Sequence, residues 1–202
     1  MSAELLPPIA FPQILIVGKI LSLAKRLRKR FSLRFFNPSC RLAIIRILAG
    51  KRRIMLKGIP SFLNADLLWA LAAMGHGDEL AIVDRNFSAD RVARKTSSGK
   101  LFILSGIDAP IAIGGILQLM PLDTFVESPV SHMTSVDHPA QILDVHHDVI
   151  SVCSKVERRN IVSRPIERMA YYPLAMSCFA VVQTGEDRPY ANFILKKGVV
   201  ST

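Results

Sequence analysis

The sequence predicts an α/β domain of three layers, with helices on both faces of a central sheet. From Met55 onwards, helical patterns and short apolar runs alternate along the chain, which is typical of layered α/β proteins. Half of the 202 residues are apolar and 21% are charged, which favours a sizeable core over general disorder. The composition changes at Met55, so we expect a basic extension over 1–54 and one domain over 55–202.

The charge distribution supports this division. Residues 1–54 carry 12 Lys/Arg and one acid, whereas 55–202 carry 14 Lys/Arg and 15 acids. The net charge of +10 therefore belongs to the extension, and we expect no nucleic-acid partner for the domain. Within the extension, "ILSLAKRLRKRF" is a basic amphipathic pattern that could contact an anionic membrane. The alternative is a segment without a role, absent from the mature protein.

The domain begins with a predicted helix and a predicted strand. The segment 64–75, "NADLLWALAAMG", places its leucines on one face. Asn64 can cap its start, and Gly75 can take the left-handed conformation at its end. The run "ELAIVD" (79–84) is apolar and bounded by polar residues, as expected for a buried strand.

The middle of the domain continues the alternation. Residues 99–106, "GKLFILSG", predict a strand or an extended loop, and 111–120 predict a helix that stops before Pro121. Residues 128–136 look extended. The segment 139–157 predicts a helix that starts at Pro139.

The C-terminal part predicts one helix and two strands. The segment 167–178, "ERMAYYPLAMSC", predicts a short helix that is interrupted near Pro173. Strands are expected over 178–186 and 190–199, joined by a turn at 187–189.

The segment "AMGHGDELAIVD" carries the first candidate functional residues. His76 lies between two glycines where a helix ends, which suits a reactive side chain better than a core residue. Asp84 follows the strand, at a position where loops of α/β sheets collect functional groups. Asp84 comes eight positions after His76, about one strand's length, so the two need not touch within one chain. They could share a cleft through a folded loop or a neighbouring subunit.

Three separated motifs, in order, resemble the ribose pyranase / fucose mutarotase family. They are "MLKGIPSFLNADLLWALAAMGHGDELAIVDRNFS", "LQLMPLDTFVE" and "ERMAYYPLAMSCFAVVQTGEDRPYANFILKKGV". The resemblance covers residues 55–202. It implies a ring-forming sugar mutarotase fold, a cofactor-free isomerase of free monosaccharides, and a homo-oligomer, commonly a decamer with sites at subunit contacts. The expected location is the cytoplasm.

The resemblance also implies roles for single residues. His76 matches the catalytic histidine and Asp84 a substrate-binding aspartate. Arg168 occurs where the fucose branch has arginine, and Tyr172 matches the tyrosine after it, although Tyr171 could take that place after a small shift. The sugar-binding segment of the last strand matches three consecutive residues: Tyr190, Ala191 and Asn192. L-fucose is the expected sugar, although Pro173 departs from the acidic residue that fucose mutarotases often carry there.

These residue types suit mutarotation. A base takes the proton of the anomeric hydroxyl while an acid protonates the ring oxygen, and the roles reverse on reclosure. Histidine has a reference pKa of about 6.5, so it can fill both roles near neutral pH. Carboxylate, guanidinium and amide groups make directional bonds to hydroxyls. Without the resemblance, His76 would equally fit a helix-terminal polar residue, and Asp84 a turn former.

Other histidines and cysteines give no metal prediction. His146 and His147, with Asp144 and Asp148, form the one cluster that suggests a metal. Adjacent histidines on a helix point about 100° apart, so a solvated helix face is the preferred interpretation. His132 and His138 are isolated in the sequence. The cysteines Cys40, Cys153 and Cys178 lack paired spacing and indicate ordinary thiols in a reducing compartment.

Two alternative functions stay open. One is D-ribose pyranase, which interconverts the pyranose and furanose forms of ribose. The other is a non-catalytic monosaccharide-binding module, anchored to a membrane by the basic extension.

Overall fold

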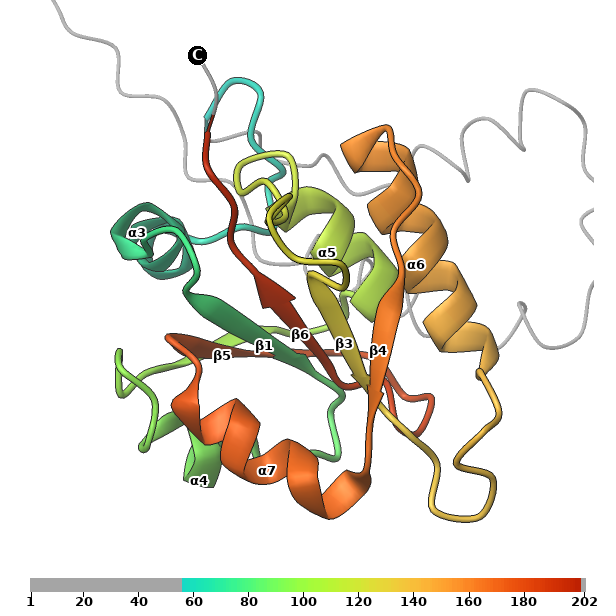
Figure 1. Ribbon diagram of the computed structural model, residues 1–202. Helices are drawn as coiled ribbons and strands as arrows, with labels where there is room; N and C mark the ends of the chain where they lie inside the picture. Colours follow the sequence, from blue (N-terminus) through green and yellow to red (C-terminus); the bar gives the residue numbers. More distant parts are fainter. Residues whose placement is uncertain (1–55, 201–202) are drawn as a thin grey trace, which may run out of the picture. The chain divides into compact units, whose positions relative to one another are not determined.

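The structure is a computed structural model that describes residues 56–200 (Figure 1). The predictions for the basic extension and for Cys40 lie outside the described residues. Within them, six strands and five helices form one α/β domain. The free thiols of Cys153 and Cys178 are both buried.

One six-stranded sheet forms the centre of the domain, with the order β2-β5-β1-β6-β3-β4. Five strands run in the same direction, and β6 is antiparallel to both of its neighbours, β1 and β3. The strands are β1 (Glu79–Val83), β2 (Leu101–Leu104), β3 (Val130–Met133), β4 (Ser163–Ile166), β5 (Ala180–Thr184) and β6 (Phe193–Lys196). The antiparallel β6 therefore starts at the edge of the sheet where the other strands end.

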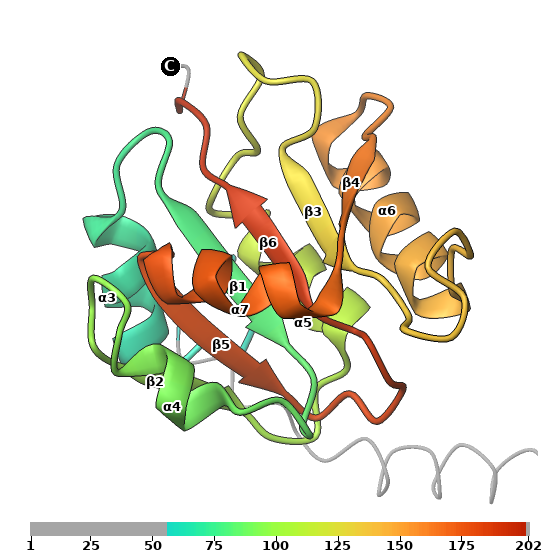
Figure 2. The ribbon, with the colours of Figure 1, turned by 60° about the horizontal axis from the view of Figure 1, so that its bottom comes forward.

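Helices cover both faces of the sheet (Figures 1 and 2). On one face lie α3 (Ala65–Ala73), α5 (Ala109–Ile116) and α6 (Asp144–Glu157), and on the other lie α4 (Ala89–Ala93) and α7 (Arg168–Ser177). Each face has its own apolar core, because alternate residues of one strand point to opposite sides: Leu80 and Ile82 of β1 pack into the first core, and Ala81 and Val83 into the second. The predicted three-layer architecture is confirmed.

The helix before His76 is built as expected at its start and differently at its end. The Asn64 side chain accepts a hydrogen bond from the Leu67 amide at 2.9 Å, which confirms the predicted cap. Gly75 was expected in the left-handed conformation, but Gly77 has it, with φ +83°. The Gly75 amide donates to the Asp78 carboxylate at 2.7 Å, which holds Gly75 in place, so the left-handed residue of the turn comes two positions later.

Two further helix predictions need correction. The helix expected from Pro139 begins only at Asp144, because the extended Leu143 caps it and Gln141 bonds back to His138 in a turn. The helix expected to break at Pro173 is continuous through it. Pro173 is exposed, and so is Met169, whose carbonyl loses a donor there, so water can replace the missing bond.

The sequence patterns missed α4 and β4, which are short. The two C-terminal strands are both present, but β5 and β6 do not pair with each other, because β1 lies between them. This arrangement brings the start of β6 beside the end of β1, and so brings Asn192 beside Asp84.

Candidate functional site at the two ends of the sheet

Most of the sequence-predicted site residues lie at the edge where the parallel strands end, here called the carboxyl edge. Asp84 follows β1, and Arg168 follows β4 as the first residue of α7. Tyr190, Ala191 and Asn192 precede β6, which starts at this edge. In open α/β sheets, ligand contacts collect at such an edge.

Asp84 and Asn192 form a buried pair at the carboxyl edge. The Asn192 amide nitrogen donates to Asp84 Oδ2 at 2.9 Å, and the Asp84 backbone amide donates to Asn192 Oδ1 at 3.1 Å. The second carboxylate oxygen accepts from the Asn86 amide at 2.8 Å, so Asp84 is also the turn former that the simpler interpretation expected. Burial raises the pKa of the Asp84 carboxyl above its ordinary value.

Tyr190 is held in an unusual backbone conformation beside this pair. Its φ is +61°, a left-handed value that is uncommon for a residue with a side chain. The Tyr190 carbonyl lies 3.0 Å from Nε2 of His146, and the following Ala191 is fully buried. The side chain of Tyr190 is half-buried.

The two neighbouring tyrosines of α7 have different surroundings. Tyr171 is fully buried, and its hydroxyl donates to the Phe193 carbonyl at 2.9 Å. Tyr172 is half-buried and stacks on Phe87, with ring centroids 5.1 Å apart. Phe87 also makes an edge contact with Tyr171. Arg168 is exposed at the start of the same helix.

His76 lies at the opposite edge of the sheet, before the start of β1. Its Nε2 is 3.3 Å from Oδ1 of Asp123, and its ring makes an edge contact with Phe125, with centroids 5.3 Å apart. The side chain of His76 is 47% exposed, whereas that of Asp123 is 4% exposed. A bond from the Phe125 amide lowers the pKa of Asp123 below its ordinary value, and His76 adds to this effect.

Asp123 accepts but cannot donate while it is ionised, so the neutral imidazole of His76 carries its proton on Nε2. Nδ1 then keeps a free lone pair. The result is a half-exposed base whose ring orientation is set by a buried carboxylate.

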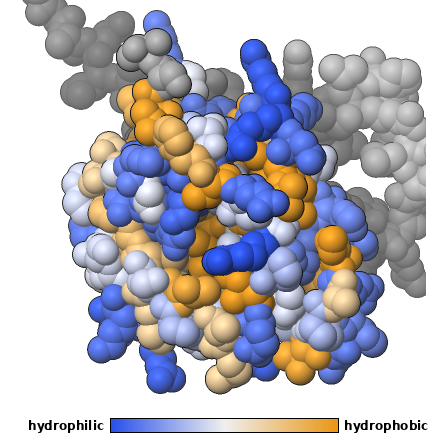
Figure 3. All heavy atoms as spheres, in the orientation of Figure 1, coloured by the Kyte–Doolittle hydropathy of each residue, from blue (hydrophilic) through white to orange (hydrophobic). Residues whose placement is uncertain are grey.

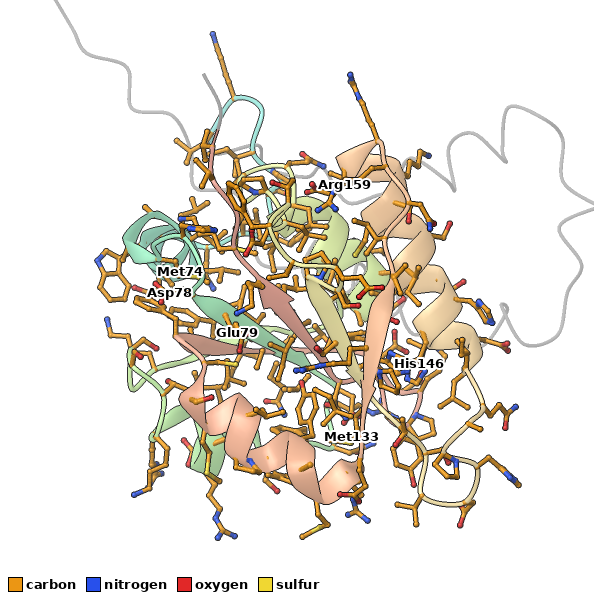
Figure 4. The ribbon with its side chains drawn as sticks, viewed as in Figure 1. Met74, Asp78, Glu79, Met133, His146 and Arg159 are labelled. Carbon is orange, nitrogen blue, oxygen red and sulfur yellow. The ribbon has the colours of Figure 1, made fainter. Side chains whose placement is uncertain are left out.

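His76 and Asp84 do not meet within one chain. Seven residues lie between them, and the five that form β1 alone span roughly 16 Å. Figure 4 shows the separation: Asp78 and Glu79 lie at one edge, and Met133 and His146 lie at the other. One chain therefore holds two separate groups of candidate residues, here called the candidate half-sites.

Sequence reasoning missed three polar residues near these half-sites. Asp123 lies in the motif "LQLMPLDTFVE" but was given no role. The interpretation of His146 as part of a solvated face is wrong, because its side chain is fully buried, while its neighbour His147 is exposed. His132 is not isolated either, since its ring lies 4.4 Å from that of His146. Histidine is a polar residue type, so its position in the sequence gave no signal that it faces the core.

Among residues 56–200, no three His, Cys, Asp or Glu side chains come together in a way that could hold a metal ion. In the same part of the chain, no helix is long and apolar enough to cross a membrane.

The fold defines a class of α/β protein with a mixed six-stranded central sheet, and the candidate residues lie at the two ends of that sheet. The chain belongs to the RbsD / FucU transport protein family, whose model matches residues 57–200. The resemblance found in the sequence is thereby confirmed.

Individual relatives agree with this assignment. The chain is 39% identical to the fucose mutarotase of Homo sapiens over 73% of this chain and 96% of the relative. It is 37% identical to the L-fucose mutarotase of Actinobacillus pleuropneumoniae, over 72% of this chain and 97% of the relative. The crystal structure of the fucose mutarotase from Streptococcus pneumoniae in complex with L-fucose matches with a TM-score of 0.65 and 34% identity, over 72% of this chain and all of that one.

Proposed function

We propose that this protein is an isomerase that interconverts the α and β anomers of free L-fucose by opening and reclosing the sugar ring. The proposal is supported by the named relatives and by one observation in the structure: a half-exposed imidazole, oriented by a buried carboxylate, at the predicted catalytic position His76. Nothing in this chemistry requires a cofactor, because breaking and re-forming the C1–O5 bond needs only acid and base groups that move protons.

In the proposed mechanism, Nδ1 of His76 takes the proton of the anomeric hydroxyl. The C1–O5 bond breaks as the ring oxygen gains a proton from an acid, and the open-chain aldehyde forms. Rotation about C1–C2 presents the other face of the aldehyde, and reclosure reverses both transfers. Asp123 contributes to these reaction steps by keeping the proton of the neutral His76 imidazole on Nε2, which leaves Nδ1 free to act as the base.

Tyr172 is the proposed partner acid at the sugar. Its half-buried ring is stacked on Phe87, whereas the hydroxyl of Tyr171 is already committed to a backbone carbonyl. Because Tyr171 is fully buried and its hydroxyl is already hydrogen-bonded, Tyr172 is the better candidate for this role. The remaining proposed contacts to the sugar hydroxyls come from Asp84, Arg168, Tyr190, Ala191 and Asn192.

For His76 and Asp84 to serve one sugar, the separation of the candidate half-sites calls for a second subunit. We propose a homo-oligomer, a decameric ring in its complete form, in which His76 of one subunit faces the carboxyl edge of its neighbour. Phe125, beside His76, is 75% exposed in the single chain, as expected for an aromatic residue that a partner covers. Figure 3 shows further apolar side chains interspersed with polar ones on one face of the domain.

Complementation tests the shared site. We expect His76→Ala and Asp84→Asn to be inactive alone. When both variants are produced in the same cell at equal levels, random mixing leaves both native residues in about one site in four. Activity of that order supports a site between subunits, and its complete absence from mixed oligomers contradicts it.

The function itself is tested by saturation-transfer NMR with L-fucose, D-ribose and D-galactose in parallel. Accelerated exchange between the L-fucose anomers is the expected result. Faster pyranose–furanose exchange of ribose alone would indicate the ribose branch, and binding of fucose without faster exchange would indicate a non-catalytic module.

We also propose that the protein acts in the cytoplasm, which the two unpaired, buried thiols support. Contact of residues 1–54 with a membrane, or their absence from the mature protein, stays a prediction.

A further inference from the structure

We propose that His146 is a positioning residue of the sugar site, which fixes the segment 190–192 through the Tyr190 carbonyl and thereby sets the affinity for the sugar. The inference rests on the proposed function, because it assumes that this segment binds the sugar. His146 belongs to α6 and lies outside the motifs that predicted the site.

The hydrogen bonds of His146 define its protonation state. The Leu143 backbone amide donates to Nδ1 at 3.3 Å, and an amide nitrogen cannot accept. Nε2 must therefore carry the proton of the neutral ring, and it donates to the Tyr190 carbonyl at 3.0 Å. One imidazole thus joins the first turn of α6 to the segment before β6.

The ring has little freedom to turn away from these partners. It is fully buried, lies against His132 and makes an edge contact with Phe193 of β6. His132 is in turn held by a 2.9 Å hydrogen bond between its Nδ1 and the Ser163 hydroxyl. The donor at Nε2 is therefore directed at one carbonyl.

That carbonyl belongs to a residue whose conformation needs support. Tyr190 has φ +61°, which places its Cβ close to backbone atoms and costs energy in any residue other than glycine. Asn192, two residues further on, forms the buried pair with Asp84. A shift of the Tyr190 backbone would therefore move both the tyrosine ring and the amide that orients Asp84.

A second tether from α6 reaches the same loop. Arg188 bonds Asp148 of α6 at 2.7 Å and forms a two-bond pair with the buried Glu186, at 2.9 and 3.0 Å. This tether is partly exposed, whereas the one from His146 is buried. Loss of His146 should thus loosen residue 190 while Arg188 keeps the loop attached.

The expected consequence separates binding from chemistry. His146 lies at the carboxyl edge, and His76 lies at the other end of β1, so loss of His146 should leave proton transfer by the neighbouring subunit intact. The sugar then meets a binding segment that is less ordered before it arrives, and affinity falls.

Two amide variants separate the contributions of the two hydrogen bonds that the His146 ring makes, one with the Leu143 amide and one with the Tyr190 carbonyl. In His146→Asn the short amide can still accept from the Leu143 amide but cannot reach the Tyr190 carbonyl. In His146→Gln the longer amide can donate to that carbonyl. We expect the Asn variant to raise KM for L-fucose anomer exchange by about 5- to 10-fold with kcat within about 2-fold, since one buried hydrogen bond is lost. The Gln variant should restore KM to within about 2-fold of the wild type.

The measurement is saturation-transfer NMR on the full-length oligomer over a range of L-fucose concentrations, with His147→Asn, an exposed neighbour on the same helix, as the matched control. If His146 only stabilises the start of α6, the Asn variant will resemble the wild type and the Gln variant will be the weaker one, and the inference is overturned. A fall in kcat at unchanged KM also overturns it. If the wild type itself shows no exchange, the proposed function has failed, and L-fucose binding by titration calorimetry with the same variants still decides the inference.

Discussion

The two edges of the sheet hold their polar residues in different ways. At the edge before the start of β1, here called the His76 edge, the His76 side chain is half-exposed and has one polar contact, to Asp123 at 3.3 Å. At the carboxyl edge, Asp84, Asn192 and His146 are buried, and each makes at least two hydrogen bonds. The proposed proton-transfer group is therefore left reachable, and the proposed recognition groups are already ordered.

This difference has a physical reason. A buried polar group destabilises the fold unless it is hydrogen-bonded. The buried polar side chains at the carboxyl edge therefore need hydrogen-bond partners within the protein. A group that exchanges protons with a ligand must instead keep a free lone pair. Substitution of the buried polar residues Asp84, Asn192 and His146 should thus affect stability and affinity, while substitution of His76 should affect rate.

The largest expected effect is that of His76→Ala on rate. Loss of a positioned acid/base group should lower anomer exchange by roughly 10²- to 10⁴-fold. The free energy of unfolding should change by less than about 0.5 kcal/mol, because the side chain is half-exposed. Saturation-transfer NMR and chemical denaturation measure the two quantities. Unchanged exchange would remove His76 from the mechanism and would end the contrast between the two edges.

The next effect is a loss of stability in mild acid that arises at the carboxyl edge. Burial lowers the pKa of His132 to about 4, and burial also lowers the pKa of His146. Below pH 6.5 the unfolded chain binds protons at these positions while the folded chain does not. The free energy of unfolding should therefore fall as the pH drops from about 6.5 to about 4, by roughly 3 kcal/mol for His132 alone.

The variant His132→Asn isolates this contribution. Its amide can still bond Ser163, but it does not titrate, so its unfolding free energy should fall less steeply between pH 6.5 and 4.5 than that of the wild type. Carboxylates such as Asp84 and Glu186, which also have shifted pKa values, are common to both proteins and cancel in the difference. Parallel curves for the two proteins would show that His132 takes up its proton over the same pH range in the folded and the unfolded state, and would contradict the lowered pKa.

A smaller effect distinguishes the two tyrosines of α7. Tyr171→Phe removes the buried hydrogen bond from the tyrosine hydroxyl to the Phe193 carbonyl and should cost about 0.5–1.5 kcal/mol of stability, with exchange retained. Tyr172→Phe should lower exchange several-fold at unchanged stability, because the stacking on Phe87 remains. Thermal unfolding and the NMR assay check both. The reverse pattern would assign the family's tyrosine role to Tyr171.

Sequence patterns predicted the architecture well, because they record burial on each face of a strand or helix. The strand after His76 and the helix capped by Asn64 are examples in which local chemistry agrees with the fold. The predicted start at Pro139 and the predicted break at Pro173 were wrong. The hydrogen bond from the Leu143 amide to the His146 ring fixes the start of α6 at Asp144. At Pro173 the helix continues, because the Met169 carbonyl that loses its donor is exposed to water.

The site was predictable only in part. The resemblance supplied His76 and Asp84, but the strand order that pairs Asp84 with Asn192 depends on contacts 108 residues apart. The same holds for Asp123 beside His76, 47 residues away. Histidine in the core looks identical to histidine on the surface in a sequence, so His132 and His146 became visible only in the fold.

The smallest expected effect concerns the support of the His76 edge. The ammonium group of Lys197 donates to the carbonyls of Leu71 and Met74 at the end of α3, directly before the His76 turn. Lys197→Met should cost about 1–2 kcal/mol of stability, because two helix-end carbonyls lose a charged donor. Exchange should fall only a few-fold, because the backbone bonds that join Lys197 to Gly77 and Asp78 persist. The control is Lys196→Met, whose ion pair with Glu79 is partly exposed and should contribute less than about 1 kcal/mol. If both variants lose stability equally, the helix-end bonds add nothing beyond an ordinary surface ion pair, and the His76 edge depends on its backbone alone.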